Sequence, residues 1–301
     1  MGAPPSGVLL VDKPGGITSH DVVSRARKAL NTRKIGHAGT LDPMATGLLI
    51  LGVGPVTRLL TDIVGLGKTY EATIRLGAVT DTDDSEGAVL ETADAAALAA
   101  LSSARISAGV SALTGPISQV PSTVSAIKVA GRRAYDLARA GQDVELAARD
   151  VTVSRFDILA ERPVAGGLDL DVVVDCSSGT YIRALARDLG RDLGVGGHLT
   201  ALRRTRIGDF EVADAVPVDA IADSALLSPA DVARRVLGAL EVTADEARDL
   251  RHGKRLAGAA PRAAGFPAAA IGPDGRLVGI VERRGADVKS TMNLPPEELS
   301  E

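Results

Sequence analysis

Apolar residues recur along this chain in two spacings, one helical and one extended, which alternate from end to end without an internal repeat. Because alternating helices and strands pack as layers around a core, this pattern predicts an α/β fold of the mixed, α+β kind. The 301 residues suffice for two domains. After about residue 236 the sequence pattern changes to short predicted strands separated by glycine and proline turns. We therefore expect one domain over residues 1–235 and a small β-rich one over 236–301.

Several elements can be placed from local signals. Thr18 with Asp21 three residues later has the form of a capping box, and the apolar stripe that follows predicts a helix. A second helix is expected after Thr180, with arginines at i, i+4 spacing, and a helical connection broken by prolines near residues 213–240. Strands are expected over residues 47–53, 70–76, 151–159 and 168–176, with a turn over 163–167.

The chain has a single cysteine, Cys176, which can form neither an internal disulfide nor a cysteine-based zinc site. This usage predicts a reducing compartment, the cytoplasm. The first apolar run, at residues 8–11, is short and no basic residue precedes it. We expect neither a signal peptide nor a membrane span.

The net charge of −4, from 34 basic and 38 acidic residues, is unevenly distributed. No acidic residue occurs between Asp21 and Asp42, a stretch that offers phosphates a local basic surface. Its basic residues are Arg25, Arg27, Lys28, Arg33 and Lys34. Residues 61–100, in contrast, hold two basic and eight acidic residues. Among them is the run DTDDSEG at 81–87, which we interpret as a solvated acidic turn because its register does not fit a calcium loop.

Motifs for nucleotide, metal and hydrolase chemistry fail on spacing. A phosphate-binding loop ending in GLGKT would need a glycine at position 62, which is Asp62. The four histidines are scattered, without the spacing of a metal site. The G-x-S-x-G motif of a serine nucleophile is absent. We expect no metal and no cofactor.

The segment GHAGTLDPMATGLL at 36–49 leaves two interpretations of Asp42 open. Asp42 followed by Pro43 has the form of a helix N-cap with proline at the first helical position. Alternatively, the glycine-rich turn presents the carboxylate at the end of a sheet. The three tyrosines, Tyr70, Tyr135 and Tyr181, likewise either pack in the core or stack on a nucleobase.

This segment closely resembles the catalytic motif of the TruB-type tRNA pseudouridine synthases. Five further segments resemble the family in the same order, so the resemblance covers about residues 7–210. They are GVLLVDKPGGITSHD at 7–21, GKTYEATIRLGAVTDTDDSEG at 67–87, PSTVSAIKVAGRRAYDLARAG at 121–141, CSSGTYIRALARDLG at 176–190 and GGHLTALRRTRIGDF at 196–210. The fold implied is a pseudouridine synthase catalytic domain, with a central, mainly antiparallel sheet flanked by helices, and a small C-terminal RNA-binding domain of the PUA type.

The resemblance assigns roles to individual residues. Asp42 matches the family's essential aspartate, and Arg183 matches the arginine that pairs with it. Tyr70 matches the tyrosine that stacks on the target base and is a candidate for assisting proton removal. His37, Tyr181 and Leu202 match positions that line the uridine site, and Lys13 matches a lysine that supports the catalytic loop. Residues 119–150 match a mobile insertion that clamps the RNA arm, with Lys128, Arg132, Arg133 and Arg139 facing phosphate.

The implied activity is the isomerisation of uridine 55 in the TΨC arm of tRNA. The N1 glycosidic bond breaks, the uracil turns and C5 is joined to the ribose, so no cofactor is needed. Asp42, kept ionised by Arg183, acts as a nucleophile on a flipped-out base. Attack on the ribose and attack on the uracil ring are both open. We expect a monomer whose partner is tRNA.

Two other functions compete with the synthase. A tRNA-binding protein that remodels its target without chemistry would also use the basic segment near the N-terminus. A hydrolase of nucleotides or sugar phosphates that uses Asp42 would depend on a metal ion.

Overall fold

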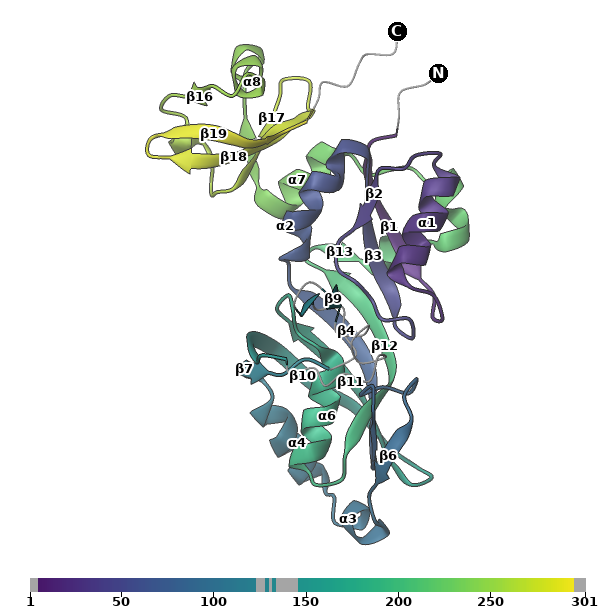
Figure 1. Ribbon diagram of the computed structural model, residues 1–301. Coiled ribbons are helices and arrows are strands. Elements are labelled where there is room, and N and C mark those ends of the chain that lie inside the picture. The colour runs from purple at the N-terminus through teal and green to yellow at the C-terminus, as the bar shows by residue number, and fades with distance from the viewer. Residues whose placement is uncertain (1–4, 123–127, 130–131, 134–145, 295–301) are drawn as a thin grey trace. The chain divides into compact units, whose positions relative to one another are not determined.

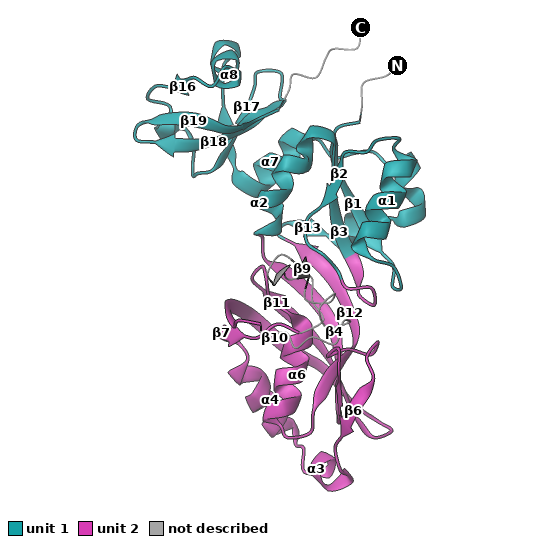
Figure 2. Cartoon of the chain, viewed as in Figure 1, with its two compact units in different colours: residues 1–41, 48–65, 208–301 teal, residues 42–47, 66–207 magenta. Residues whose placement is uncertain are grey.

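The computed structural model describes residues 5–122, 128–129, 132–133 and 146–294 (Figure 1). The chain divides into two compact units, which Figure 2 shows in different colours. Unit 1 consists of residues 1–41, 48–65 and 208–301, and unit 2 consists of residues 42–47 and 66–207.

The N-terminal part of unit 1 is a small set of strands covered by α1 (Ser19–Ala29). Strand β1 (Gly7–Lys13) pairs in parallel with β14 (Val216–Pro217), and β2 (Ile35–His37) pairs antiparallel with β3 (Thr46–Val53). Their buried aliphatic side chains form one core with the inner face of α1. The helical turns of this part are η1 (Gly54–Leu59), α2 (Leu60–Val64), η2 (Val212–Asp214) and η3 (Val218–Asp223). A short strand, β13 (Phe210–Glu211), comes directly before η2 in the chain.

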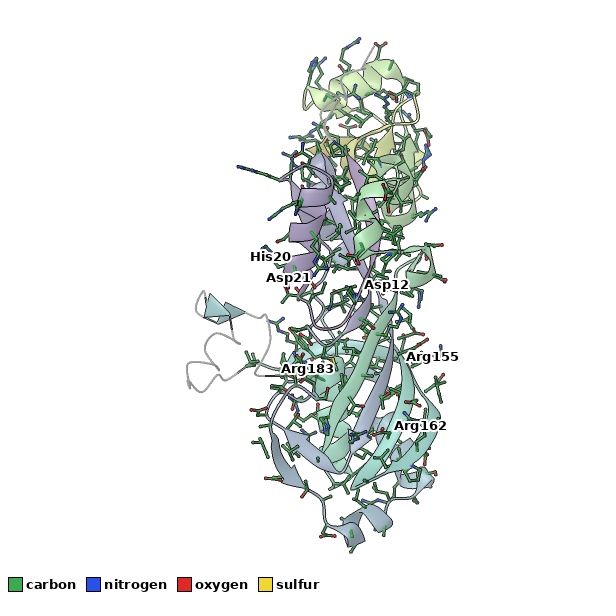
Figure 3. The ribbon with its side chains drawn as sticks, turned by 90° about the vertical axis from the view of Figure 1, so that its right-hand side faces the viewer. Asp12, His20, Asp21, Arg155, Arg162 and Arg183 are labelled. Carbon is green, nitrogen blue, oxygen red and sulfur yellow. The ribbon has the colours of Figure 1, made fainter. Side chains whose placement is uncertain are left out.

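The capping box predicted for α1 is confirmed. The Thr18 hydroxyl accepts a hydrogen bond from the Asp21 amide at 3.0 Å, and the Asp21 carboxylate accepts one from the Thr18 amide at 2.8 Å. The bonds from Thr18 lower the pKa of Asp21 below its usual value. Figure 3 shows Asp21 beside His20 at the start of this helix.

The C-terminal part of unit 1 has the short strands that the sequence predicts. They form a five-stranded sheet in the order β15-β17-β18-β19-β16, and its core includes Leu250 of α8 and Val281. Its elements are α7 (Pro229–Leu237), β15 (Ala239–Glu241), α8 (Ala244–Arg251), β16 (Arg255–Leu256), η4 (Ala260–Arg262), β17 (Ala268–Ile271), β18 (Leu277–Arg284) and β19 (Asp287–Asn293). Pro229, predicted to break a helix, instead begins α7 at the position where its missing amide hydrogen costs nothing.

Unit 2 is built on five antiparallel strands in the order β12-β4-β11-β10-β7. Helix α6 packs on β12 and β4, and α4 packs on β10 and α6. The strands are β4 (Lys68–Leu76), β7 (Gly115–Gln119), β10 (Arg149–Val164), β11 (Gly167–Cys176) and β12 (Gly197–Ile207), and the helices are α3 (Ala95–Ala99), α4 (Ser103–Ala112) and α6 (Ile182–Asp192). Two hairpins complete the unit, β5 (Ala78–Thr80) with β6 (Val89–Thr92) and β8 (Lys128–Val129) with β9 (Arg132–Arg133).

The turn predicted over residues 163–167 is shorter in the structure. Pro163 pairs with Leu168 and Val164 with Gly167, so only residues 165–166 lie outside the strands. Gly166 supplies the positive φ, 73°, that such a tight connection needs. The sequence showed the turn residues but not how far the strand pairing extends into them.

Gly47, which lies in unit 2 at the start of β3, closely approaches β12. It pairs with Arg204 of β12 and has a φ of 100°. A Cβ atom at this position would lie 2.3 Å from the Arg204 carbonyl oxygen. Only glycine fits here, because both the backbone conformation and the available space exclude a side chain.

We expect Gly47→Ala to lower the free energy of unfolding by more than the roughly 1–2 kcal/mol of a left-handed conformation alone. Gly166→Ala is the matched control, because Gly166 also has a positive φ but no heavy atom within 4 Å of the place that an added Cβ would occupy. Urea unfolding of both variants checks this. Equal losses would contradict the steric argument.

Candidate active site

Asp42 lies in an irregular turn and not at the start of a helix. Bends at Pro43 and Met44 lead directly into β3, so the N-cap interpretation is wrong. The apolar run that follows is buried as a strand, and this burial outweighs the local capping signal. The Asp42 side chain is 36% exposed, so its carboxylate is reachable from solvent.

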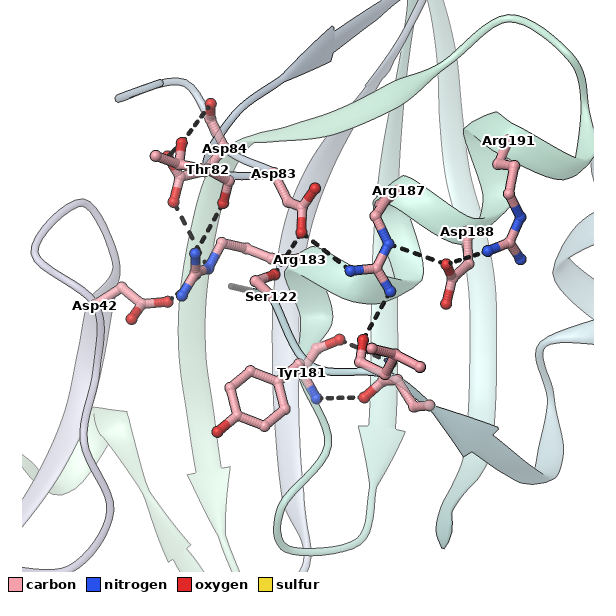
Figure 4. Close-up of polar contacts among 12 residues, drawn as sticks. Asp42, Thr82, Asp83, Asp84, Ser122, Tyr181, Arg183, Arg187, Asp188 and Arg191 are labelled. Carbon is pink, nitrogen blue, oxygen red and sulfur yellow. Dashed lines mark hydrogen bonds and ion pairs between the residues drawn. The ribbon is translucent and has the colours of Figure 1, made fainter. Parts of the chain in front are cut away.

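Arg183 at the start of α6 holds that carboxylate. Its Nε donates to Asp42 Oδ2 at 3.0 Å, and its Nη1 donates to the Thr82 carbonyl oxygen at 2.8 Å (Figure 4). The Arg183 side chain is only 3% exposed. A buried guanidinium with fixed partners restricts the orientation of the carboxylate that it pairs with.

Asp84 is a second carboxylate at this arginine, and the sequence analysis missed it. Its Oδ2 lies 3.6 Å from Arg183 Nε, and its side chain is 5% exposed. The neighbouring Asp83 is also buried and pairs with Arg187 at 3.2 Å. The interpretation of residues 81–87 as a solvated turn is therefore wrong for these two aspartates, because each is paired with an arginine of α6.

Tyr70 lies on β4 with its side chain buried, beside two buried cations. In the strand register Tyr70 is opposite Arg204 of β12, and Lys68 is two residues away on the same face of β4. Burial raises the pKa of the Tyr70 hydroxyl, a change that a hydrogen bond and the charge of Arg204 oppose and the charge of Asp42 increases. Burial, aided by Arg204, lowers the pKa of Lys68 to about 8. Sequence reasoning found Tyr70 but neither cation.

Comparison with known proteins shows to which family the chain belongs. Residues 27–182 match the family model described as TruB family pseudouridylate synthase (N terminal domain). The chain belongs to the TruB family. Two C-terminal TruB models match residues 183–243 and 237–295. The chain is 56% identical to a tRNA pseudouridine synthase B of Leifsonia xyli subsp. xyli over all of both chains, and 55% identical to one of Nocardia farcinica over 98% of this chain and 95% of that one.

Solved structures agree on the fold. A Cbf5-Nop10-Gar1 complex includes a chain 25% identical to this TruB-family chain, with a TM-score of 0.71, over 96% of this chain and 85% of that one. The structure of an H/ACA RNP bound to a substrate RNA gives a TM-score of 0.70 at 24% identity, over 97% and 86%. The mixed α/β synthase fold with a small β-rich C-terminal sheet of the PUA type is confirmed.

Two further predicted residues, Tyr181 and Leu202, lie in unit 2. Tyr181 is the N-cap of α6, and its amide and carbonyl are both bound by the Gln119 side chain, at 2.8 and 3.0 Å. Leu202 lies on β12 opposite Ala72 of β4 and is 8% exposed. The structure thus brings Asp42, Tyr70, Arg183, Tyr181 and Leu202 into the same unit of the TruB fold.

The predicted residues Lys13 and His37 lie in unit 1. The buried Lys13 ammonium donates to the carbonyl oxygens of Pro14 and Ile17, at 2.9 and 2.7 Å, and so fixes the turn before α1. His37 is the last residue of β2. Ser19 of α1 binds both backbone groups of Leu41, the residue that precedes Asp42 in the chain.

The predicted RNA-clamping insertion, residues 119–150, lies partly outside the described residues. Lys128 and Arg132 belong to the β8–β9 hairpin, in which Lys128 pairs with Arg133 and Val129 with Arg132. The side chains of these residues, and all of Arg139, lie outside the described part of the structure.

Two arginines of unit 2, Arg155 and Arg162, lie away from the site. Arg155 and Arg162 of β10 lie on the opposite side of unit 2 from Arg183 in Figure 3. Both are about half exposed and pair with aspartates of the same hairpin, Asp157 and Asp171.

Within the described ranges, no helix has the length and apolar character that crossing a membrane requires.

Proposed function

We propose that this chain isomerises uridine to pseudouridine in tRNA, with uridine 55 of the TΨC arm as its target. Membership of the TruB family and the curated relatives, named tRNA pseudouridine synthase B, support the reaction and the substrate class. The observation that carries the proposal is the 3.0 Å contact between the part-exposed Asp42 carboxylate and the buried Arg183 guanidinium.

The chemistry needs a nucleophile that stays ionised. Asp42 attacks the ribose or the uracil ring and forms a covalent bond, and the N1 glycosidic bond breaks. The uracil then turns, C5 bonds to the ribose carbon, and the bond to Asp42 breaks, which returns the free carboxylate. The hydrogen on C5 then leaves as a proton and N1 gains one, so substrate and product are isomers. The Arg183 guanidinium pairs with the carboxylate and holds its oxygen in place before attack, and Asp84 and the Thr82 carbonyl hold Arg183.

The target uridine must leave its stack before a side chain can reach it, at a cost of a few kcal/mol. The Tyr70 ring would return roughly 1–3 kcal/mol of this by stacking on the base. Tyr181 and Leu202, on neighbouring elements of the same unit, would line the uridine site, and the family resemblance implies the same role for His37. Lys13 supports the turn that precedes α1.

We propose further that residues 1–235 act as the catalytic domain and residues 236–301 as a PUA-type RNA-binding domain. The five-stranded sheet of residues 239–293 supports this boundary. Phosphate contacts would come from the basic segment around α1 and from Lys128 and Arg132. Because Asp42, Tyr70 and Arg183 come from one chain, the protein needs no second copy, and we expect it to act as a monomer in the cytoplasm.

Tritium release tests the function. Unmodified tRNA carrying uridine labelled with tritium at C5 is incubated with the protein in the presence of EDTA, and tritium in the solvent is counted. We expect one equivalent released per tRNA, and none from a tRNA with cytidine at position 55. No release, with or without EDTA, would favour a protein that binds tRNA without chemistry. Release that occurs only without EDTA would contradict an isomerisation that needs no metal ion.

We expect Tyr70→Phe to keep stacking on the base but to lose rate by about 10²-fold or more, if the hydroxyl takes part in proton transfer. Because burial raises the pKa of Tyr70, the hydroxyl stays protonated at neutral pH, and a proton transfer from C5 must coincide with loss of its own proton. Single-turnover tritium release measures the rate, and tRNA affinity is the control. An unchanged rate would reduce Tyr70 to a stacking platform.

A further inference from the structure

Arg187 lies one turn after Arg183 on α6 and contacts three separate parts of unit 2. Its Nη1 is 3.2 Å from Asp83 Oδ2, its Nη2 donates to the Val120 carbonyl at 2.7 Å, and its Nε donates to Asp188 at 3.1 Å. The side chain is 25% exposed. One guanidinium thus connects α6, the acidic turn and the backbone just beyond β7 (Figure 4).

Asp83 is the central partner in this cluster. Its Oδ2 also accepts a hydrogen bond from the Ser122 hydroxyl at 2.6 Å, and its carbonyl oxygen accepts one from the Leu199 amide of β12 at 3.0 Å. Asp83 has a φ of 60°, in the left-handed region that non-glycine residues adopt infrequently and aspartate more often than most. The bonds to Arg187 and Ser122 restrict its side chain from two directions.

The two residues that flank Asp83 are those that hold Arg183. The Thr82 carbonyl accepts from Arg183 Nη1, and Asp84 lies beside Arg183 Nε. A change in the backbone at Asp83 therefore moves these two partners of Arg183 at once. Arg183 in turn fixes the Asp42 carboxylate.

We propose that Arg187 is a positioning residue for the isomerisation, acting through Asp83 and the Thr82–Asp84 turn on the orientation of Arg183. The proposal rests on the proposed function. It assigns Arg187 no contact with the RNA. A lysine at this position would keep the charge but could not serve three partners lying in three directions, because only the planar guanidinium presents such a fork of donors.

The test compares single-turnover pseudouridine formation at saturating tRNA among variants of the full chain. We expect Arg187→Ala and Asp83→Asn each to slow the step by about tenfold or more, within the roughly 100-fold that a small misplacement can cost. Arg187→Lys should recover part of the rate. Arg191→Ala is the matched control, because Arg191 pairs with Asp188 from the same face of α6 but does not contact Asp83.

Coupling between variants separates positioning from general stability. If Arg187 acts through Asp83, the double variant Arg187→Ala/Asp83→Asn loses no more rate than the worse single variant. In an Arg183→Lys background, Arg187→Ala should have almost no further effect. Additive losses in both cycles, or a full rate in Arg187→Ala, would overturn the proposal, and if that variant does not fold, Asp83→Asn decides by the same criteria. An inactive wild-type protein would overturn the proposed function and this inference with it.

Discussion

Asp42→Asn should abolish pseudouridine formation while leaving tRNA binding nearly unchanged. The amide is close in size to the carboxylate and can still accept a hydrogen bond from Arg183, so the turn around it keeps its shape. It is not a nucleophile, however, and so cannot take the role that we propose for Asp42 in the covalent route. We expect a fall in single-turnover rate of at least about 10⁴-fold.

Tritium release measures the rate of this variant, and filter binding with unmodified tRNA measures its affinity. Asp157→Asn is the matched control, because it makes the same chemical change in a half-exposed aspartate of β10, at a distance from the site. Retained turnover in Asp42→Asn would remove Asp42 from the role of nucleophile. Loss of binding would show that the carboxylate holds the RNA.

Arg183→Lys should lose rate by about 10²–10³-fold, the usual effect of removing a preorganised donor. The lysine keeps one positive charge between Asp42 and Asp84, but it cannot hold the Thr82 carbonyl and a carboxylate in the fixed geometry of a guanidinium. Single-turnover rates check this prediction. They are measured at saturating tRNA, so that a change in tRNA affinity does not affect the rate.

Stability provides the second measurement for this position. Arg183→Ala should be less stable than Arg183→Lys by about 3–5 kcal/mol, because it leaves the buried Asp84 carboxylate without its cation. Arg191→Ala serves as control, because the Arg191 side chain is 65% exposed, and should change stability little. Equal stability of the two Arg183 variants would mean that Asp84 does not depend on the charge.

The sequence predicted local structure well where the signal is local. The Thr18–Asp21 capping box and the strands of β3, β4 and β11 are specified by residues a few positions apart. At Asp42 local signals were ambiguous, because an aspartate before proline suits both a helix start and a turn. Only the resemblance between motifs separated the two possibilities.

The rest of the site depends on contacts that no local pattern contains. Asp83 and Asp84 look like surface residues in an acidic run, yet arginines about a hundred positions later in the chain bury and pair them. One available signal was the row of arginines at i, i+4 spacing on α6, which has a charge opposite to that of the acidic run. No sequence signal of this kind marks Arg204, because its burial depends on the pairing of β12 with β4.

The six residues 42–47 belong to unit 2, although the chain on either side of them belongs to unit 1. An excised fragment of residues 66–207 would therefore retain the arginine and the tyrosine but lack the carboxylate. A gene fragment that encodes only residues 66–207 therefore cannot give an active enzyme. Any shortened protein must also contain residues 42–47 and the parts of unit 1 that connect them to the chain.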